Sequence, residues 1–131
     1  MNRNEIFPPI KGHRLGFFQR NPLDPVLSPK SIAVIGASER EGSVGRTLFW
    51  NLISNPFGGT VYPINAKRSN VFGVRAYPSL AALPEQVECV AIAVPSSTIP
   101  DLAEQAGQHG AKGLIVISAG FKEMGAPGEE L

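Results

Sequence analysis

The sequence predicts an α/β fold in three layers, an open parallel sheet with helices on both faces. Two observations and one general rule predict it. Short apolar runs rich in β-branched residues recur along the chain, as expected of strands buried on both faces of a sheet. Segments of helical periodicity separate these runs at the spacing of βαβ units. Right-handed connections between such units bring the strands together in one parallel sheet.

Composition excludes several classes of protein. Of 131 residues, 43% are hydrophobic and 18% charged, which is typical of a globular chain and not of a disordered one. No apolar run reaches the length of a membrane span, and the N-terminus lacks the apolar core of a secretory signal, so a cytoplasmic location is expected. The single cysteine, Cys89, opens an apolar run and is expected to be a core residue.

Charge is unevenly distributed along the chain. Residues 1–75 hold ten Lys and Arg against four Asp and Glu, whereas residues 76–131 hold two against seven. A basic half suits a phosphorylated ligand. No basic stripe is interleaved with aromatic residues, so nucleic acid is not an expected partner.

The first segment and the first strand differ sharply in pattern. Residues 1–27 are rich in proline and are expected to form an extended arm, followed by a domain over residues 28–131. The apolar run 31–35 predicts the first strand. Apolar residues then recur at helical spacing from Val44, which predicts a helix that ends at Asn55.

The loop between this strand and helix is made of small residues. Strand, glycine-rich turn and helix together direct free backbone N–H groups and a helix dipole at a bound phosphate. The spacing is not the strict G-x-G-x-x-G, and an ordinary strand-to-helix connection stays an alternative. The small residues of the loop are Gly36, Ala37, Ser38, Gly42, Ser43 and Gly45.

The remaining elements follow in order. Residues 60–64 predict a second strand, and Pro63 within it predicts an edge or strand-end position. A short helical turn is expected after Ser79, which would cap it. Residues 90–94 predict a third strand.

A second long helix is expected from Ile99 to His109, with Pro100 in its first turn and Gly110 as its cap. Because His109 falls in the last turn, it is expected to be a helix-end residue and not a catalyst. Residues 114–117 predict a fourth strand.

Ligands of open parallel sheets bind beyond the carboxyl ends of the strands. Four such ends are made of small or polar residues, at 36–38, 65–67, 95–97 and 118–120. After the second strand a site for NAD requires an acidic residue. This chain offers Asn65, Lys67 and Arg68 instead, which favours a ribose that carries a phosphate, as in NADP or coenzyme A. A solvated loop is the alternative.

Catalytic constellations are not visible in the sequence. We find no Ser/His/Asp set, no metal-ligand cluster and no paired carboxylates on one element. The sequence therefore indicates binding, with no catalytic residue and no metal site.

Several segments in order resemble a known family. The chain over residues 21–131 resembles the N-terminal CoA-binding domain of NDP-forming acyl-CoA synthetases, which include ADP-forming acetate–CoA ligases and are related to the α subunit of succinyl-CoA synthetase. The segments that carry the resemblance are SPKSIAVIGAS at 28–38, GSVG at 42–45, VYPIN at 61–65, YPSL at 77–80 and ISAGFKE at 117–123.

This resemblance implies a Rossmann-like domain that holds coenzyme A, incomplete at its C-terminal end. It implies that residues of the glycine-rich loop lie against the CoA phosphates, that the 65–67 segment lies by the nucleotide, and that two further segments line the pantetheine path. The implied CoA-binding residues are Gly36, Ala37, Ser38, Ser43, Val44, Gly45, Asn65, Lys67, Val94, Pro95, Ser96, Ser118, Ala119 and Gly120.

The resemblance also implies a longer ligase with ATP-grasp domains or subunits as partners. Its phosphorylated histidine belongs to the next domain, and neither His13 nor His109 matches it. The chain alone is therefore not expected to be active as an acid–thiol ligase. Two alternatives remain: a CoA-binding regulatory domain fused to a GNAT-type protein-lysine acetyltransferase, and an NADP-binding oxidoreductase domain.

Overall fold

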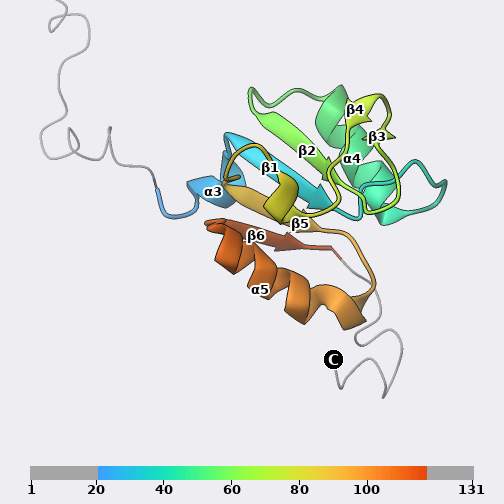
Figure 1. The fold of residues 1–131 in the computed structure, drawn as a ribbon. Coiled ribbons are helices and arrows are strands. Elements are labelled where there is room, and N and C mark those ends of the chain that lie inside the picture. Colours follow the sequence, from blue (N-terminus) through green and yellow to red (C-terminus); the bar gives the residue numbers. More distant parts are fainter. Residues whose placement is uncertain (1–20, 118–131) are drawn as a thin grey trace, which may run out of the picture.

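A computed structural model describes residues 21–117 and contains a four-stranded parallel sheet in the order β2-β1-β5-β6 (Figure 1). The strands are β1 (Ser31–Ile35), β2 (Thr60–Ile64), β5 (Cys89–Ile92) and β6 (Gly113–Val116). Ala33 of β1 lies opposite Tyr62 on one side and Val90 on the other. Because all pairings are parallel, the four carboxyl ends lie at one edge of the sheet. The predicted Rossmann-like α/β fold is confirmed.

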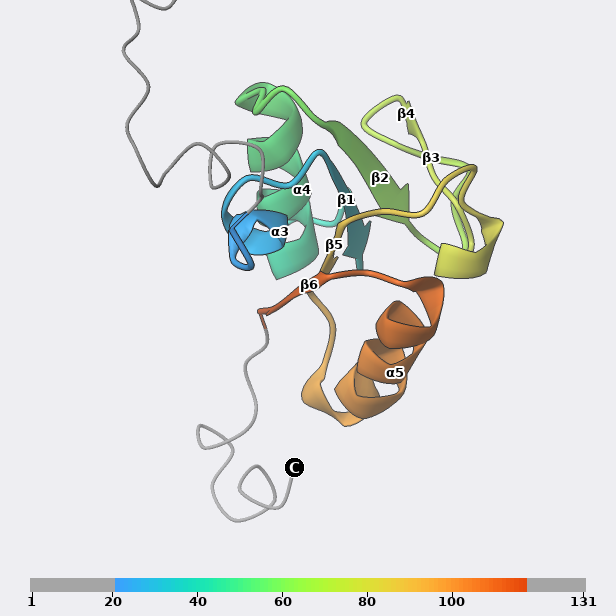
Figure 2. The same cartoon turned by 90° about the vertical axis from the view of Figure 1, so that its left-hand side faces the viewer.

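The two long helices cover opposite faces of the sheet, as Figures 1 and 2 show together. They are α4 (Val44–Ser54) and α5 (Ile99–His109), and their bounds lie within one residue of those that the sequence predicts. Side chains of β1 alternate between the two faces: Val34 packs with Phe49 of α4, whereas Ala33 and Ile35 pack with Ile99 of α5. Burial on both faces explains the unbroken apolar run of this strand.

The ends of the helices follow their local chemistry. Ser43 caps α4, where its Oγ accepts a hydrogen bond from the Arg46 N–H at 3.2 Å. Gly110 ends α5 with φ +92°, a left-handed conformation that glycine adopts without strain. His109 Nε2 accepts a hydrogen bond from the Val87 N–H at 3.0 Å, so this histidine has a structural role at the end of the helix.

Two predictions about single residues are also confirmed. Pro63 lies in β2, an edge strand of the sheet, where its missing N–H removes no bond to an inner strand. Cys89 is fully buried in the core. Burial, with a smaller effect of the Glu88 charge, raises the pKa of its thiol to about 11.

Some elements differ from the prediction. The strand β5 ends at Ile92, two residues earlier than expected, and β6 ends at Val116, one residue earlier. The turn after Ser79 is a 3-10 helix, Leu80–Ala82, and the Ser79 side chain makes no capping hydrogen bond.

Three short elements were not predicted. Helix α3 (Asp24–Leu27) lies within the expected extended arm, where Pro25 in the first turn is buried beside Gly113. Strands β3 (Asn70–Val71) and β4 (Val74–Arg75) form an antiparallel hairpin.

The rest of the arm, residues 1–20, and the segment from residue 118 onward lie outside the described residues. Within residues 21–117 no helix is long and apolar enough to cross a membrane.

Candidate functional site

An open cavity of about 660 Å³ lies at the carboxyl edge of the sheet, between the ends of β1 and β5 and the start of α4. Its walls combine backbone of the β1–α4 loop with two cationic side chains and the apolar end of β5. The lining residues are Gly36, Ser38, Arg40, Gly42, Ser43, Val44, Gly45, Lys67, Ala93, Val94, Pro95 and Ile117.

Two glycines let backbone segments approach each other closely at the floor of this cavity. Gly36 has φ +92°, and a Cβ there would lie 2.3 Å from the Ala93 carbonyl oxygen. A Cβ on Gly45 would lie 1.8 Å from the Gly36 carbonyl oxygen. No side chain fits at either position, so the end of β5, the loop and the first turn of α4 meet through their backbones.

The N-terminus of α4 faces the cavity. Val44 and Gly45 both line it, and N–H groups of a first helical turn have no acceptor within the helix. The Ser43 hydroxyl holds this end in place: it donates to the Arg40 carbonyl at 2.8 Å while accepting from the Arg46 N–H. Free N–H groups and the helix dipole together favour an anionic group here.

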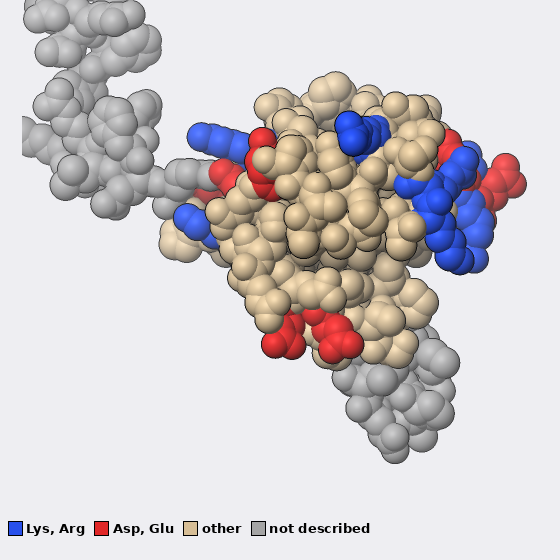
Figure 3. Space-filling model, viewed as in Figure 1, with Lys and Arg blue, Asp and Glu red and all other residues tan. Residues whose placement is uncertain are grey.

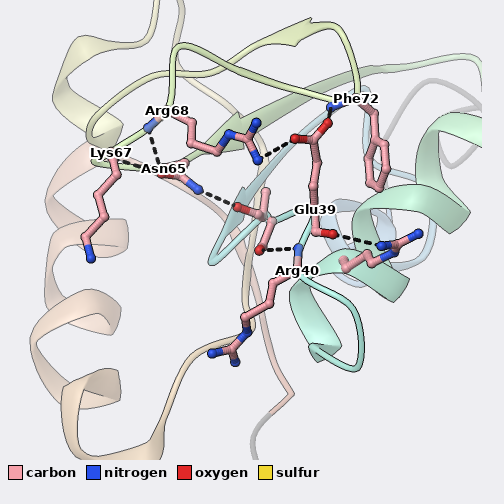
Figure 4. A network of polar contacts seen from close by, with 9 residues as sticks. Glu39, Arg40, Asn65, Lys67, Arg68 and Phe72 are labelled. Carbon is pink, nitrogen blue, oxygen red and sulfur yellow. Dashed lines mark hydrogen bonds and ion pairs between the residues drawn. The ribbon is translucent and has the colours of Figure 1, made fainter.

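Two cations add to this positive potential. Arg40 and Lys67 line the cavity, and neither side chain forms an ion pair within the described part of the chain. Arg68 differs, because its Nη1 lies 2.5 Å from Glu39 Oε2 (Figure 4). Figure 3 shows Lys and Arg side chains gathered at this end of the molecule. Lys67 is thus available to a ligand, whereas the charge of Arg68 is already paired.

A second cavity of about 390 Å³ lies on the α5 side of the loop and shares Gly36, Ser38 and Lys67 with the first. The side chain of Asn65 connects two segments of the wall of this second cavity. The Asn65 Nδ2 donates to the Ala37 carbonyl at 3.0 Å, and its Oδ1 accepts from the N–H groups of Lys67 and Arg68. The side chain of Asn65 therefore fixes the end of β2 against the β1–α4 loop, in the wall of the second cavity.

The structure brings most of the sequence-predicted site residues together. Eight of them line the first cavity: Gly36, Ser38, Ser43, Val44, Gly45, Lys67, Val94 and Pro95. Ala37 and Asn65 line the second cavity. Ser96 is buried and lines neither, while Ser118, Ala119 and Gly120 lie outside the described residues.

Sequence reasoning missed Arg40 and Ala93 in the first cavity and Gln105 of α5 in the second. A cation inside a glycine-rich loop is a usable signal for Arg40. Gln105 gives no such signal, because its place beside the strand ends depends on how α5 packs.

Within residues 21–117 no group of three or more His, Cys, Asp and Glu side chains could hold a metal ion.

At the carboxyl edge of the parallel sheet lie a glycine-containing loop, the N-terminus of α4 and two cations that have no ion-pair partner within residues 21–117. These features define a Rossmann-like domain with a site suited to a phosphorylated ligand. Comparison with known proteins identifies the family. The chain belongs to the CoA binding domain family, whose model matches residues 30–126.

Curated relatives agree with this assignment. The chain is 38% identical over 122 residues to an ADP-forming acetate–CoA ligase of Archaeoglobus fulgidus, covering 92% of this chain and 18% of the relative. It is 45% identical over 104 residues to an ADP-forming 4-hydroxybutyrate–CoA ligase of Nitrosopumilus maritimus, covering 79% of this chain and 15% of the relative. The chain therefore spans less than a fifth of the length of these two relatives.

A solved structure shows the same fold. The dinucleotide-forming acetyl-coenzyme A synthetase 1 of Ca. Korarchaeum cryptofilum, solved with phosphate and ADP, is 37% identical with a TM-score of 0.74. The match covers 82% of this chain and 23% of that one. The chain is thus a CoA-binding domain homologous to part of the ADP-forming acetate–CoA ligases, and coenzyme A, not NADP, is the ligand that these findings support.

Proposed function

We propose that this chain binds coenzyme A in the 660 Å³ cavity and serves as the CoA-holding domain of a longer ADP-forming acyl-CoA ligase. One observation carries the proposal. Arg40 and Lys67, with no ion-pair partner within residues 21–117, line a cavity that also receives the N-terminus of α4. Three sources of positive potential around one space suit a ligand with several phosphate groups.

Each part of coenzyme A has a chemically suitable wall. The diphosphate meets the N–H groups of the first turn of α4 and the Arg40 guanidinium. The ribose phosphate meets Lys67, which borders both cavities, so that the nucleoside extends toward the second one. The thin pantetheine arm passes the small and apolar residues at the end of β5, Ala93, Val94 and Pro95.

The role in a ligase rests on the relatives. Named ADP-forming CoA ligases contain this domain as a minor share of their length, and we assign the chemistry of bond formation to their remaining domains or subunits. Because those relatives are named for different acyl groups, we propose no acyl group for this chain. The domain holds the thiol carrier while other parts of the protein act on it.

Calorimetric titration with coenzyme A, dephospho-CoA, NADPH and NADH tests the proposal. A charge-assisted contact to the ribose phosphate contributes about 1.5–3 kcal/mol, so coenzyme A should bind roughly ten- to a hundredfold more tightly than dephospho-CoA. Lys67→Ala should remove most of this difference. Lys112→Ala is the matched control, since Lys112 is exposed and lines neither cavity.

Two results would contradict the proposal. Tighter binding of NADPH than of coenzyme A would favour an oxidoreductase domain. Equal affinity for coenzyme A and dephospho-CoA would remove Lys67 from the phosphate site.

A further inference from the structure

We infer that the ion pair between Glu39 and Arg68 positions the two cations of the ligand cavity, so that Glu39 is a positioning residue for CoA binding although it does not line the cavity. This inference rests on the proposed function, because it concerns how the same site is held. An acidic side chain is not expected in a loop that binds anions, and a positioning role explains why Glu39 is there.

Glu39 joins three separate segments of the chain (Figure 4). Its Oε2 pairs with Arg68, which follows β2, and its Oε1 accepts the Phe72 N–H of the β3–β4 hairpin at 3.0 Å. Its backbone carbonyl accepts from Arg46 Nη1 of α4 at 2.8 Å. The Glu39 side chain is partly buried, with 28% of it exposed. Loop, strand end, hairpin and helix therefore meet at one residue.

The hairpin provides a firm anchor for this contact. Phe72 has φ +50°, the one positive φ of a non-glycine residue among the described residues, and such a conformation persists only where its surroundings support it. The ring of Phe72 packs edge-on against Trp50, with 5.1 Å between ring centroids, and Arg46 lies over it at 5.4 Å. Val71 beside it is fully buried. Glu39 thus connects the ligand loop, residues 36–43 between β1 and α4, to a turn that packing against the core already supports.

Each residue of the ion pair is adjacent in sequence to one cation of the ligand cavity. Arg40 directly follows Glu39, and Lys67 directly precedes Arg68. Arg40 and Lys67 line the cavity, whereas Glu39 and Arg68 do not. In Figure 4 the side chains of Arg40 and Lys67 extend away from the pair. The pair therefore adds a second link, beside the Asn65 hydrogen bonds, between the two backbones from which the ligand-facing cations project.

A direct electrostatic role for Arg68 makes the opposite prediction. If Arg68 attracted the anionic ligand and Glu39 only weakened that attraction, Glu39→Gln would release a cation and tighten binding. If the pair positions Arg40 and Lys67, the same substitution loosens both cations and weakens binding. The sign of the change separates the two roles.

The experiment compares Glu39→Gln, Glu39→Ala, Arg68→Ala and the double variant Glu39→Ala/Arg68→Ala. The matched control is Glu41→Gln, which removes the same charge from the same loop, since the exposed Glu41 side chain makes no hydrogen bond or ion pair among residues 21–117. Calorimetry gives the affinity for coenzyme A and dephospho-CoA, and hydrogen exchange measured by NMR follows the Phe72 amide.

We expect each single substitution of the pair to weaken CoA binding about three- to tenfold, and the double variant to bind no more weakly than the worse single variant, because the two residues act as a unit. The preference for coenzyme A over dephospho-CoA should fall in step, since Lys67 loses its place. Glu39→Ala should speed exchange of the Phe72 amide, which loses its acceptor. Glu41→Gln should not weaken CoA binding and should leave exchange of the Phe72 amide unchanged.

Unchanged or tighter CoA binding by Glu39→Gln, with normal binding by the unsubstituted chain, overturns this inference and leaves the proposed function standing. Additive losses in the double variant overturn it as well. Absence of CoA binding by the unsubstituted chain overturns the proposed function and the positioning role together.

Discussion

Replacement of Gly45 by alanine tests whether the backbone contact between α4 and the β1–α4 loop is essential. A Cβ on Gly45 would lie 1.8 Å from the Gly36 carbonyl oxygen and 2.8 Å from its carbon. Because non-bonded heavy atoms prefer separations of about 3.5 Å, the start of α4 has to retreat by roughly 1.5 Å. Both clashing atoms belong to the backbone, so no side chain can rotate away to relieve the overlap.

Two opposing effects determine how much Gly45→Ala changes the free energy of unfolding. Alanine favours the helical conformation over glycine by up to about 1 kcal/mol. Overpacking costs typically about 1–3 kcal/mol, and a rigid backbone neighbour places this site at the upper end. We therefore expect Gly45→Ala to lower the free energy of unfolding by about 2 kcal/mol, which corresponds to a fall in Tm of roughly 10 °C.

Thermal and urea unfolding, with CoA titration of each variant, provide the assay. Gly107→Ala is the matched control: Gly107 lies in α5, and a Cβ there meets nothing within 4 Å. The control should gain about 0.5–1 kcal/mol from helix propensity and keep its CoA affinity. If Gly45→Ala is as stable as Gly107→Ala and binds coenzyme A equally well, the reasoning from backbone contact is refuted.

Three further predictions concern the rest of the chain. His109→Ala should destabilise the fold by about 1–3 kcal/mol, because it leaves the Val87 N–H without its acceptor, while CoA affinity measured by calorimetry stays unchanged; weakened CoA binding would contradict the structural role. Since the pKa of Cys89 rises from 9.0 to about 11 in the folded state, the unfolded chain releases its thiol proton first; the resulting stabilisation is complete below pH 9 and is lost between pH 9 and 11. Cys89→Ala should flatten this part of the stability profile in urea titrations, and an unaltered profile would exclude the thiol as its source. A coupled assay with acetyl-CoA, ADP and phosphate should detect no ATP formation by this chain, and clear turnover would show that the chain carries catalytic groups of its own.

The sequence predicts the main sheet and both long helices because each has a pattern of its own. Residues 31–35 form an unbroken apolar run, and Val44 to Ser54 repeat apolar residues at helical spacing, so their structures follow from burial. The β3–β4 hairpin has two residues in each strand, too few for a period to appear. Helix α3 has only four residues, and its burial depends on contact with β6, far along the chain.

Part of the candidate site can likewise be predicted from the sequence, and part depends on tertiary contacts. Glycine content locates the loop that faces the cavity, because close backbone contacts require glycine at Gly36 and Gly45. Sequence alone cannot distinguish the tasks of Arg40, Lys67 and Arg68, which are all cations near strand ends. The distinction depends on Glu39, which pairs with Arg68 across a tertiary contact and leaves the other two facing the cavity.

The central place of β1 in the sheet has a consequence for the order of folding during synthesis. β1 pairs with β2 on one side and with β5 on the other, and the Ala93 N–H donates to the Ile35 carbonyl where the ligand loop begins. A nascent chain that has reached only β2 can form one edge of this arrangement but lacks the β5 backbone that encloses Gly36. Pairing of β1 with both neighbours closes two loops of the chain, and the entropy of loop closure is lost before the strand contacts stabilise the sheet. The ligand loop is therefore made early by the ribosome and acquires its shape late.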